Sequence, residues 1–468
     1  MARLIPTSGI NGADEQERRA TSALLAVMSA VREFGRSLTQ PFGAPAGPVH
    51  TFIEVPFVLD TQKVVPDGLV TVTRGTKTWT ALIEVKTGTN ELKAEQLEAY
   101  LDVARERGFD ALITISNEIP PVPGQHPTKV DKRRLKKVAL HHIPWTKILY
   151  EAVLQKEHRG VADPDQAWIL GELIRYLEHP KSGAMAFDDM GSSWVTVRDS
   201  IRSGTLRATD IPAAEVVTRF DALMNFAALQ LGRKLGTEVV TVLSRKELAE
   251  PQVRLQTQVN LLADTGTLTA AIRIPDTVGT LNVTADVRAN QIICHVDVDA
   301  PREGRGTTRV GWLVRQLKNA PVTARVDAFY LHARGTGASE LVGRLREDPK
   351  LLVGDGSREL KSFRVALMVP MGAKRGVGKG AFIDSVLQAV AVFYEEIVQH
   401  LKAWSPTPPK VRSEPTEPGV PASLISSALS SQDGVADPVE DALRPDPLAG
   451  SHVDEDGVGV APEVLEGI

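Results

Sequence analysis

The chain has 468 residues, of which 42% are hydrophobic and 24% are charged, so it is long enough for two or three domains with buried cores. Its single cysteine, Cys294, excludes an intramolecular disulfide, and without a secretory signal pattern or a long apolar run we expect a soluble cytoplasmic protein that does not enter a membrane. The net charge is −4, but it is unevenly distributed. From Leu401 onward there are 4 Lys and Arg against 12 Asp and Glu, so the preceding part has 50 basic and 46 acidic residues and is mildly basic.

Residues 14–38 predict one amphipathic helix. Glu17 falls on its apolar stripe, whereas Glu15 falls on the opposite, solvated face. A carboxylate on the buried side of a helix is unusual and suggests a functional role. The alternative is that Glu17 belongs to a charged first turn that is favourable to the helix dipole. The stripe consists of Leu24, Met28, Val31, Gly35 and Leu38.

Residues 64–85 predict a β-hairpin. Two alternating runs rich in β-branched residues flank the break Arg74–Lys77, which is typical of a tight turn with glycine at its first central position. With the two central residues of this break as the loop, the register counted inward places Asp67 opposite Glu84. Their Cβ atoms would lie about 5 Å apart, where like charges destabilise a sheet unless a cation lies between them.

Lys86 lies on the same face of the second strand as Glu84, because strand side chains alternate with a period of two. Two carboxylates beside an ammonium group suit Mg²⁺, which takes oxygen ligands and completes its shell with water and substrate phosphate. Water bound to such an ion is a better nucleophile, and the ion offsets charge that builds on phosphoryl oxygens. Lys86 could orient the water, deprotonate it or neutralise the phosphate, and the sequence does not choose among these roles.

The motif "PD" at residues 66–67, followed by "EVK" at residues 84–86, resembles the PD-(D/E)xK, or restriction-endonuclease-like, nuclease superfamily over residues 14–155. The resemblance implies an αβββαβ core, with Mg²⁺ or Mn²⁺ as the cofactor. The family often places a further metal-binding or metal-orienting glutamate on the first helix, a role that falls here on Glu17. An isolated Glu-x-Lys is common on solvated surfaces, so the identification depends on the order of the elements. Catalysis is assigned to Asp67, Glu84 and Lys86, and metal binding to Asp67, Glu84 and Glu17.

Residues 91–108 predict a second helix, on which Gln96 and Tyr100 stand one turn apart with Lys93 nearby. A Gln-x-x-x-Tyr arrangement after the lysine strand resembles the RecB-like branch of the superfamily. That resemblance implies that this helix supports the active site and the nucleic-acid backbone. A tyrosine inside a helix is more often a packing residue, so the motif supports the assignment only in this order of elements.

Two further core strands are predicted within residues 109–117 and 136–148. The second contains the pair His141-His142. Adjacent strand residues point to opposite faces, so we expect these histidines to be structural and not to share a metal ion.

The rest of the chain predicts three regions after a nuclease-like domain at residues 1–160. Residues 161–236 form a helical connecting region, and residues 237–404 form a second, α+β domain of unknown role. That domain opens with an antiparallel meander of three alternating runs, the first at residues 253–263. Residues 405–468 are rich in Pro, Ser, Gly and Asp and predict a disordered acidic tail. The fold class is therefore α/β overall.

The glycine-rich loop at residues 372–382, "GAKRGVGKGAF", joins an apolar strand to a helix, as a phosphate loop does. Ala373 stands where the first glycine is needed and Gly380 replaces the hydroxyl residue, so a nucleotide triphosphatase is not expected. Basic side chains near a helix N-terminus are candidates for gripping a nucleic-acid phosphate, with a plain flexible loop as the alternative. These side chains are Lys374, Arg375 and Lys379.

Together these patterns predict a metal-dependent nuclease, a hydrolase of phosphodiester bonds with DNA as the expected polymer, that acts in repair, defence or stress response. The second domain or the tail would recognise the substrate or a protein partner. The alternative is a catalytically silent nucleic-acid-binding or assembly protein on the same fold. The intact acid, acid and lysine set favours the enzyme, because a protein that only binds has no physical need of it.

Overall fold

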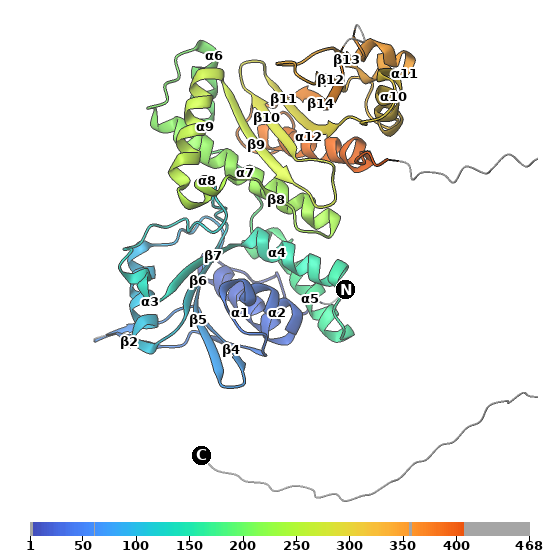
Figure 1. Ribbon diagram of the computed structural model, residues 1–468. Coiled ribbons are helices and arrows are strands. Elements are labelled where there is room, and N and C mark those ends of the chain that lie inside the picture. The colour runs from blue at the N-terminus through green and yellow to red at the C-terminus, as the bar shows by residue number, and fades with distance from the viewer. Residues whose placement is uncertain (1–2, 60, 355–357, 407–468) are drawn as a thin grey trace, which may run out of the picture. The chain divides into compact units, whose positions relative to one another are not determined.

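The computed structural model describes residues 3–59, 61–354 and 358–406, so all but the first two positions of the predicted tail lie outside the described residues. The chain has mixed α/β structure with a five-stranded sheet, a seven-stranded sheet and a separate two-stranded hairpin (Figure 1). Among the helices of the described residues, none is both long enough and apolar enough to cross a membrane.

The first, five-stranded sheet has the order β1-β4-β5-β6-β7. β4 pairs antiparallel with both β1 and β5, whereas β5, β6 and β7 run parallel to one another. Parallel neighbours need a long crossover, which a helix supplies between β5 and β6. The strands are β1 Val49–Ile53, β4 Gly68–Arg74, β5 Lys77–Val85, β6 Ala111–Ser116 and β7 Ala139–Pro144.

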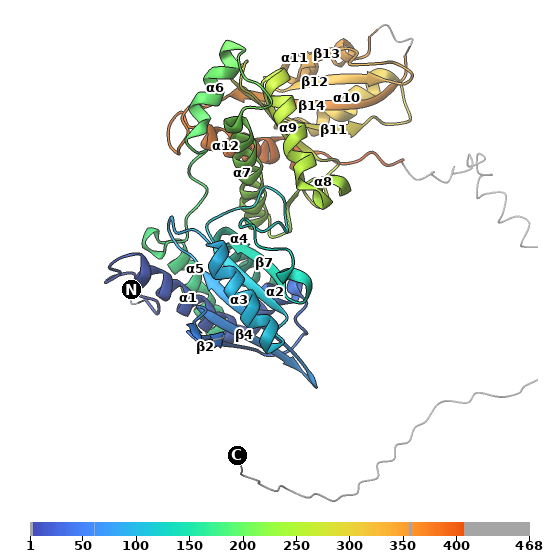
Figure 2. The same cartoon turned by 90° about the vertical axis from the view of Figure 1, so that its left-hand side faces the viewer.

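Helices cover both faces of this sheet. Ala81, Ile83 and Val85 of β5 pack in one cluster with α1, α2, α4 and α5, and Leu82 packs in another with α3. Figure 2 shows α3 lying across its face of the sheet. The alternation predicted for β5 is therefore confirmed. The covering elements are α1 Ala13–Ala30, α2 Arg32–Thr39, α3 Ala94–Arg107, α4 Trp145–Val153, α5 Pro164–Leu177, the hairpin β2 Phe57–Leu59 with β3 Gln62–Val64, and the short turns η1 Gln40–Phe42, η2 Arg134–Lys136, η3 Leu154–Arg159 and η4 Pro180–Ser182.

The prediction of one helix over residues 14–38 is wrong, because the chain breaks at Val31 into α1 and α2. Val31 has an extended backbone, with φ −106° and ψ 96°. The break lets Gly35 pack against the Met28 carbonyl, so closely that a Cβ would clash there. In a straight helix these residues would be about 10 Å apart along the axis. The whole predicted apolar stripe is buried nevertheless.

The seven-stranded sheet is antiparallel throughout, in the order β13-β12-β14-β11-β10-β9-β8. Its strands are β8 Val240–Thr241, β9 Thr267–Arg273, β10 Leu281–Asp286, β11 Gln291–Asp299, β12 Arg325–Tyr330, β13 Ser339–Leu341 and β14 Leu360–Pro370. The helices associated with it are α6 Ser193–Ser203, α7 Ile211–Leu235, α8 Arg245–Ala249, α9 Pro251–Thr265, α10 Gly306–Gln316, α11 Val342–Glu347, α12 Phe382–Glu396, η5 Pro349–Leu352 and η6 Val398–His400.

The first run of the predicted meander is a helix and not a strand, so that part of the prediction is wrong. Residues 253–263 lie in α9, while β9, β10 and β11 do form an antiparallel meander. The alternation misleads because α9 buries two polar residues one turn apart. Arg254 pairs with Asp221 at 2.7 Å, and Gln258 bonds to Thr269. Polar side chains with buried partners obscure the helical period.

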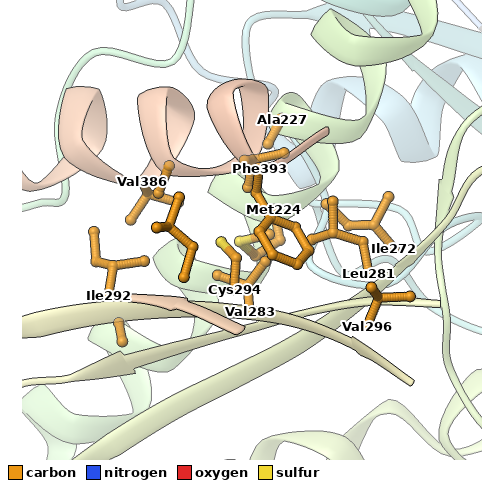
Figure 3. Close-up of a cluster of buried hydrophobic side chains, with 14 of the residues drawn as sticks. Met224, Ala227, Ile272, Leu281, Val283, Ile292, Cys294, Val296, Val386 and Phe393 are labelled. Carbon is orange, nitrogen blue, oxygen red and sulfur yellow. The ribbon is translucent and has the colours of Figure 1, made fainter. Parts of the chain in front are cut away.

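The core of this region lies between the meander and the helices α7 and α12. Figure 3 shows Met224 of α7 and Phe393 of α12 gathered above strand residues that include Val283 and Cys294. Cys294 is fully buried, and burial raises the pKa of its thiol to about 12. The cysteine is therefore a packing residue.

Candidate active site

The register of the β4–β5 hairpin is confirmed. Pairing runs from the turn down to Gly68 opposite Ile83, so Asp67, the residue before β4, comes opposite Glu84. The Oδ2 atom of Asp67 accepts a hydrogen bond from the Val85 backbone N–H at 2.8 Å. The hairpin therefore brings the two acids together through local pairing alone.

Glu84 is completely buried in β5. Burial disfavours the charged form and the nearby Asp67 repels it, so the pKa of Glu84 is raised from 4.5 to about 8. Burial also raises the pKa of Asp67, although the hydrogen bond from Val85 opposes the change. Lys86 Nζ lies 2.7 Å from Glu84 Oε1, whereas Glu84 Oε2 has no hydrogen-bond donor within the described residues. One lysine does not neutralise two buried acids, so an added cation would stabilise this pair.

Lys86 joins this pair to the first helix. Its Nζ atom lies 2.7 Å from Glu84 Oε1 and 2.9 Å from Glu17 Oε1, and it donates to the Val85 carbonyl at 3.1 Å. Burial lowers the pKa of Lys86, but the adjacent Glu84 carboxylate more than offsets this, and the net pKa is raised. The Lys86 carbonyl accepts a bond from Trp145 Nε1 at 2.9 Å. Of the three roles that the sequence leaves open, a protonated lysine fits charge neutralisation or orientation better than deprotonation of water.

Glu17 points from α1 toward the site. One carboxylate oxygen contacts Lys86 and the other accepts a bond from Asn90 Nδ2 at 3.3 Å. Glu15, by contrast, pairs with Arg19 along the same helix, as expected for a solvated face. This placement favours the interpretation in which Glu17 belongs to the site and not merely to a charged first turn.

The α3 helix supplies a second group of polar side chains. Gln96 Nε2 donates to the Tyr100 hydroxyl at 2.9 Å, and that hydroxyl donates to the Val65 carbonyl at 3.2 Å. Burial and the nearby Glu84 carboxylate raise the pKa of Tyr100. Lys93 immediately precedes α3, is exposed, and has no hydrogen bond or ion pair with any described side chain. Gln96 and Tyr100 therefore border the acid pair, whereas Lys93 does not contact it.

Asn117, directly after β6, is a positioning residue that the sequence analysis does not identify. Its Nδ2 atom donates to the Gly88 carbonyl at 2.9 Å and to the Gly183 carbonyl at 2.7 Å. Its Oδ1 atom accepts from the Met185 N–H at 2.7 Å. Asn117 thus fixes the loop that follows the lysine strand to a segment about 95 residues further along the chain. An asparagine just after a buried parallel strand is the signal that could have pointed to it.

The two adjacent histidines are structural, as predicted. His142 bonds to Thr114 Oγ1 and to the Glu118 carbonyl, each at 2.9 Å, and burial lowers its pKa to about 4. His141 points to the other face and stacks on Phe42 with ring centroids 4.4 Å apart. The rings therefore cannot share a metal ion.

The basic loop before α12 is exposed and anchored by the protein itself. Arg375 pairs with Asp189 at 3.5 Å, while Lys374 and Lys379 are exposed. Asp384, in the first turn of α12, accepts a hydrogen bond from the loop backbone at Gly378. The Asp384 carboxylate therefore already takes up one backbone N–H of this loop. Phosphate binding by this loop stays a prediction.

The residues fit a divalent cation held partly by the protein. Among the described residues, buried Glu84 has Lys86 as its one neighbouring cation, and Asp67 lies beside it. Within the described residues there is no group of three or more His, Cys, Asp or Glu side chains that could hold a metal ion. Water and substrate oxygens would have to complete the shell, as is usual for Mg²⁺.

Comparison with known proteins adds no relative, since no protein-family model, no curated protein and no solved structure matches this chain. The assignment of a function therefore depends on the residues and the geometry of the site.

Proposed function

We propose that this chain is a metal-dependent nuclease whose active site contains Asp67, Glu84 and Lys86. The observation that carries the proposal is the buried Glu84 carboxylate, which faces a second acid across the hairpin and, among the described residues, shares its one neighbouring cation, Lys86, with Glu17. A fold gains no stability from such an arrangement. A bound cation gives it a physical reason, and the lysine beside it suits a phosphate substrate.

The order of elements supports a restriction-endonuclease-like core. A helix precedes the β4–β5 hairpin, a helix follows it, and β6 and β7 then extend the sheet in parallel. The two acids lie where β4 begins and β5 ends, and α3 presents Gln96 and Tyr100 to them. This is the arrangement that the PD-(D/E)xK resemblance, and its RecB-like branch, leads us to expect.

Each residue has a distinct role in the proposed reaction. Asp67 and Glu84 would hold Mg²⁺ or Mn²⁺, which would activate water and offset charge on the phosphoryl oxygens. Lys86, held protonated by its carboxylate neighbours, neutralises negative charge that develops on the phosphate. Glu17 keeps Lys86 in place from α1. Tyr100 presents a neutral hydroxyl at the edge of the site, because burial keeps its proton bound.

Cleavage of a panel of labelled single-stranded, duplex and branched DNA, and of RNA, with Mg²⁺ or Mn²⁺ tests the proposal. We expect Lys86→Ala and Asp67→Ala each to lower the rate by at least about a hundredfold. The matched control is Lys77→Ala, because Lys77 is exposed in the hairpin turn and should leave the rate unchanged. Metal-dependent cutting that survives both active-site substitutions would show that another site, or a contaminant, cuts. Nucleic-acid binding without cutting would instead support the catalytically silent binding protein.

A further inference from the structure

The segment at residues 129–137, here called the basic segment, has the sequence KVDKRRLKK and contains six cationic side chains and one acidic one. It lies between β6 and β7 and includes the short η2 turn. Neither the active site nor the packing of the sheet accounts for this concentration of charge.

The basic segment is fixed along α3 by specific contacts. Just before it, Thr128 Oγ1 donates to the Leu92 carbonyl at 3.2 Å. The backbone N–H of Asp131 donates to Glu98 Oε1 at 2.9 Å, and Arg134 pairs with Asp102 at 2.7 Å. The anchors run from Leu92, two residues before α3, to Asp102 within it, and the helical part from Ala94 to Asp102 spans about 12 Å at the rise of a helix. The segment is therefore held in one place relative to α3.

Only one of the six cations is used for this anchoring. Arg134 is half-buried and takes up both nearby carboxylates, Glu98 and Asp102. The other five are exposed, and none of them has an ion pair with a described residue. Like charges held close together repel one another, so the fold gains nothing from this arrangement by itself. The five exposed cations are Lys129, Lys132, Arg133, Lys136 and Lys137.

The location of the basic segment links it to the proposed active site. It follows α3, the helix whose Gln96 and Tyr100 border the acid pair, and its first anchor, Leu92, lies just before that helix. One strand of duplex DNA carries a phosphate about every 3.4 Å along its axis, so the helical part of the anchored stretch corresponds to three or four phosphates, about 12 Å. Five unpaired cations on this stretch and just beyond it are enough to meet the charge of such a backbone.

We propose that the basic segment binds the phosphate backbone of DNA beside the bond that the Asp67, Glu84 and Lys86 site cuts. This inference rests on the proposed nuclease function for the identity of the polymer. The contacts are to phosphates, so they add affinity and position the duplex but carry no sequence information.

Binding of a fluorescein-labelled 24-base-pair duplex to the full chain, measured by anisotropy in EDTA at several NaCl concentrations, tests the proposal. EDTA prevents metal-dependent cutting during the measurement. The test variant replaces the five exposed cations by glutamine. The control variant carries the same number of replacements at exposed cations that have no ion pair with a described residue, namely Lys246, Arg315, Lys318, Lys350 and Lys361.

We expect the slope of log K against log[NaCl] to become shallower by about 0.9 for each lost phosphate contact, or by about 4.5 if all five contacts are lost. The control variant should keep the wild-type slope. Both variants should have the melting temperature of the wild type, which would show that neither set of replacements disrupts the fold.

Four results would overturn the inference. They are an unchanged slope in the test variant, an equal loss in the control variant, wild-type protein that does not bind the duplex at low salt, and tighter binding by the test variant. A wild type that binds through the segment but cuts no DNA would keep the DNA-binding role of the segment and reject the nuclease together with the position beside a cut bond.

Discussion

Replacement of Glu84 by glutamine should stabilise the metal-free protein at alkaline pH. The Glu84 carboxyl is buried beside Asp67, and its pKa is raised from 4.5 to about 8 although Lys86 lies 2.7 Å away. Glutamine keeps the size and shape of the side chain but removes its charge. The change removes the ion pair with Lys86, whose other carboxylate contact, with Glu17 at 2.9 Å, does not involve residue 84.

The sign of the effect follows from proton binding in the two states. Below pH 4.5 the carboxyl is protonated in both the folded and the unfolded chain, so it contributes no difference. Between pH 4.5 and about 8 the folded chain keeps a proton that the unfolded chain has lost, so stability falls as the pH rises. Above about pH 8 the carboxyl is ionised in both states, and the loss of stability that comes from the buried charge stays constant. A tenfold change in proton affinity corresponds to about 1.4 kcal/mol, so the penalty approaches about 5 kcal/mol.

Urea unfolding in EDTA at pH 5, 7 and 9 measures this difference. The free energy of unfolding of Glu84→Gln, relative to wild type, should grow by several kcal/mol from pH 5 to pH 9. The control Glu91→Gln replaces an exposed glutamate, and its free energy of unfolding should differ from wild type by the same amount at each pH. Added Mg²⁺ should stabilise the wild type at pH 9 and leave the Gln variant unchanged. A difference between the variant and wild type that does not vary with pH would refute the argument that Glu84 is a strained, buried acid.

Three further substitutions test the packing and the positioning contacts. Gly35→Ala should destabilise the protein by about 2 kcal/mol, because the new methyl group clashes with the Met28 carbonyl; an unchanged urea midpoint would contradict this. Arg254→Leu should lower the free energy of unfolding by about 3 kcal/mol, because it leaves Asp221 buried without this partner. Adding Asp221→Leu should restore most of that loss, and no recovery in the double variant would argue against the ion pair. If the proposed nuclease is correct, Asn117→Ala should slow cleavage at least tenfold, and it should speed hydrogen exchange in the loop after Lys86 with little change in the melting temperature. Unaltered hydrogen exchange would show that the Asn117 contacts are not needed to hold this loop.

The hairpin shows how much of this protein is decided locally. The turn chemistry and the period of two define the register from the turn to Gly68, and therefore the meeting of Asp67 and Glu84. The helices α3 and α7 and the meander β9 to β11 likewise follow from periodic apolar patterns. In each case the determining contacts lie within a few residues of one another, where simple spacing rules apply.

Tertiary packing decides what those rules miss. The break at Val31 depends on the close approach of α2 to α1, and the burial of Arg254 in α9 depends on a partner 33 residues away. Neither of these contacts leaves a periodic trace in the local sequence.

The chemistry of the site also depends on tertiary structure. Glu17 contacts Lys86 across 69 residues of sequence, and only the covering helices remove Glu84 from water. The raised pKa of Glu84, and with it the need for a cation, follows from this burial. The sequence by itself therefore determines which acids face each other. The tertiary structure determines that they meet away from solvent, because burial is a property of the assembled sheet and helices and not of the hairpin.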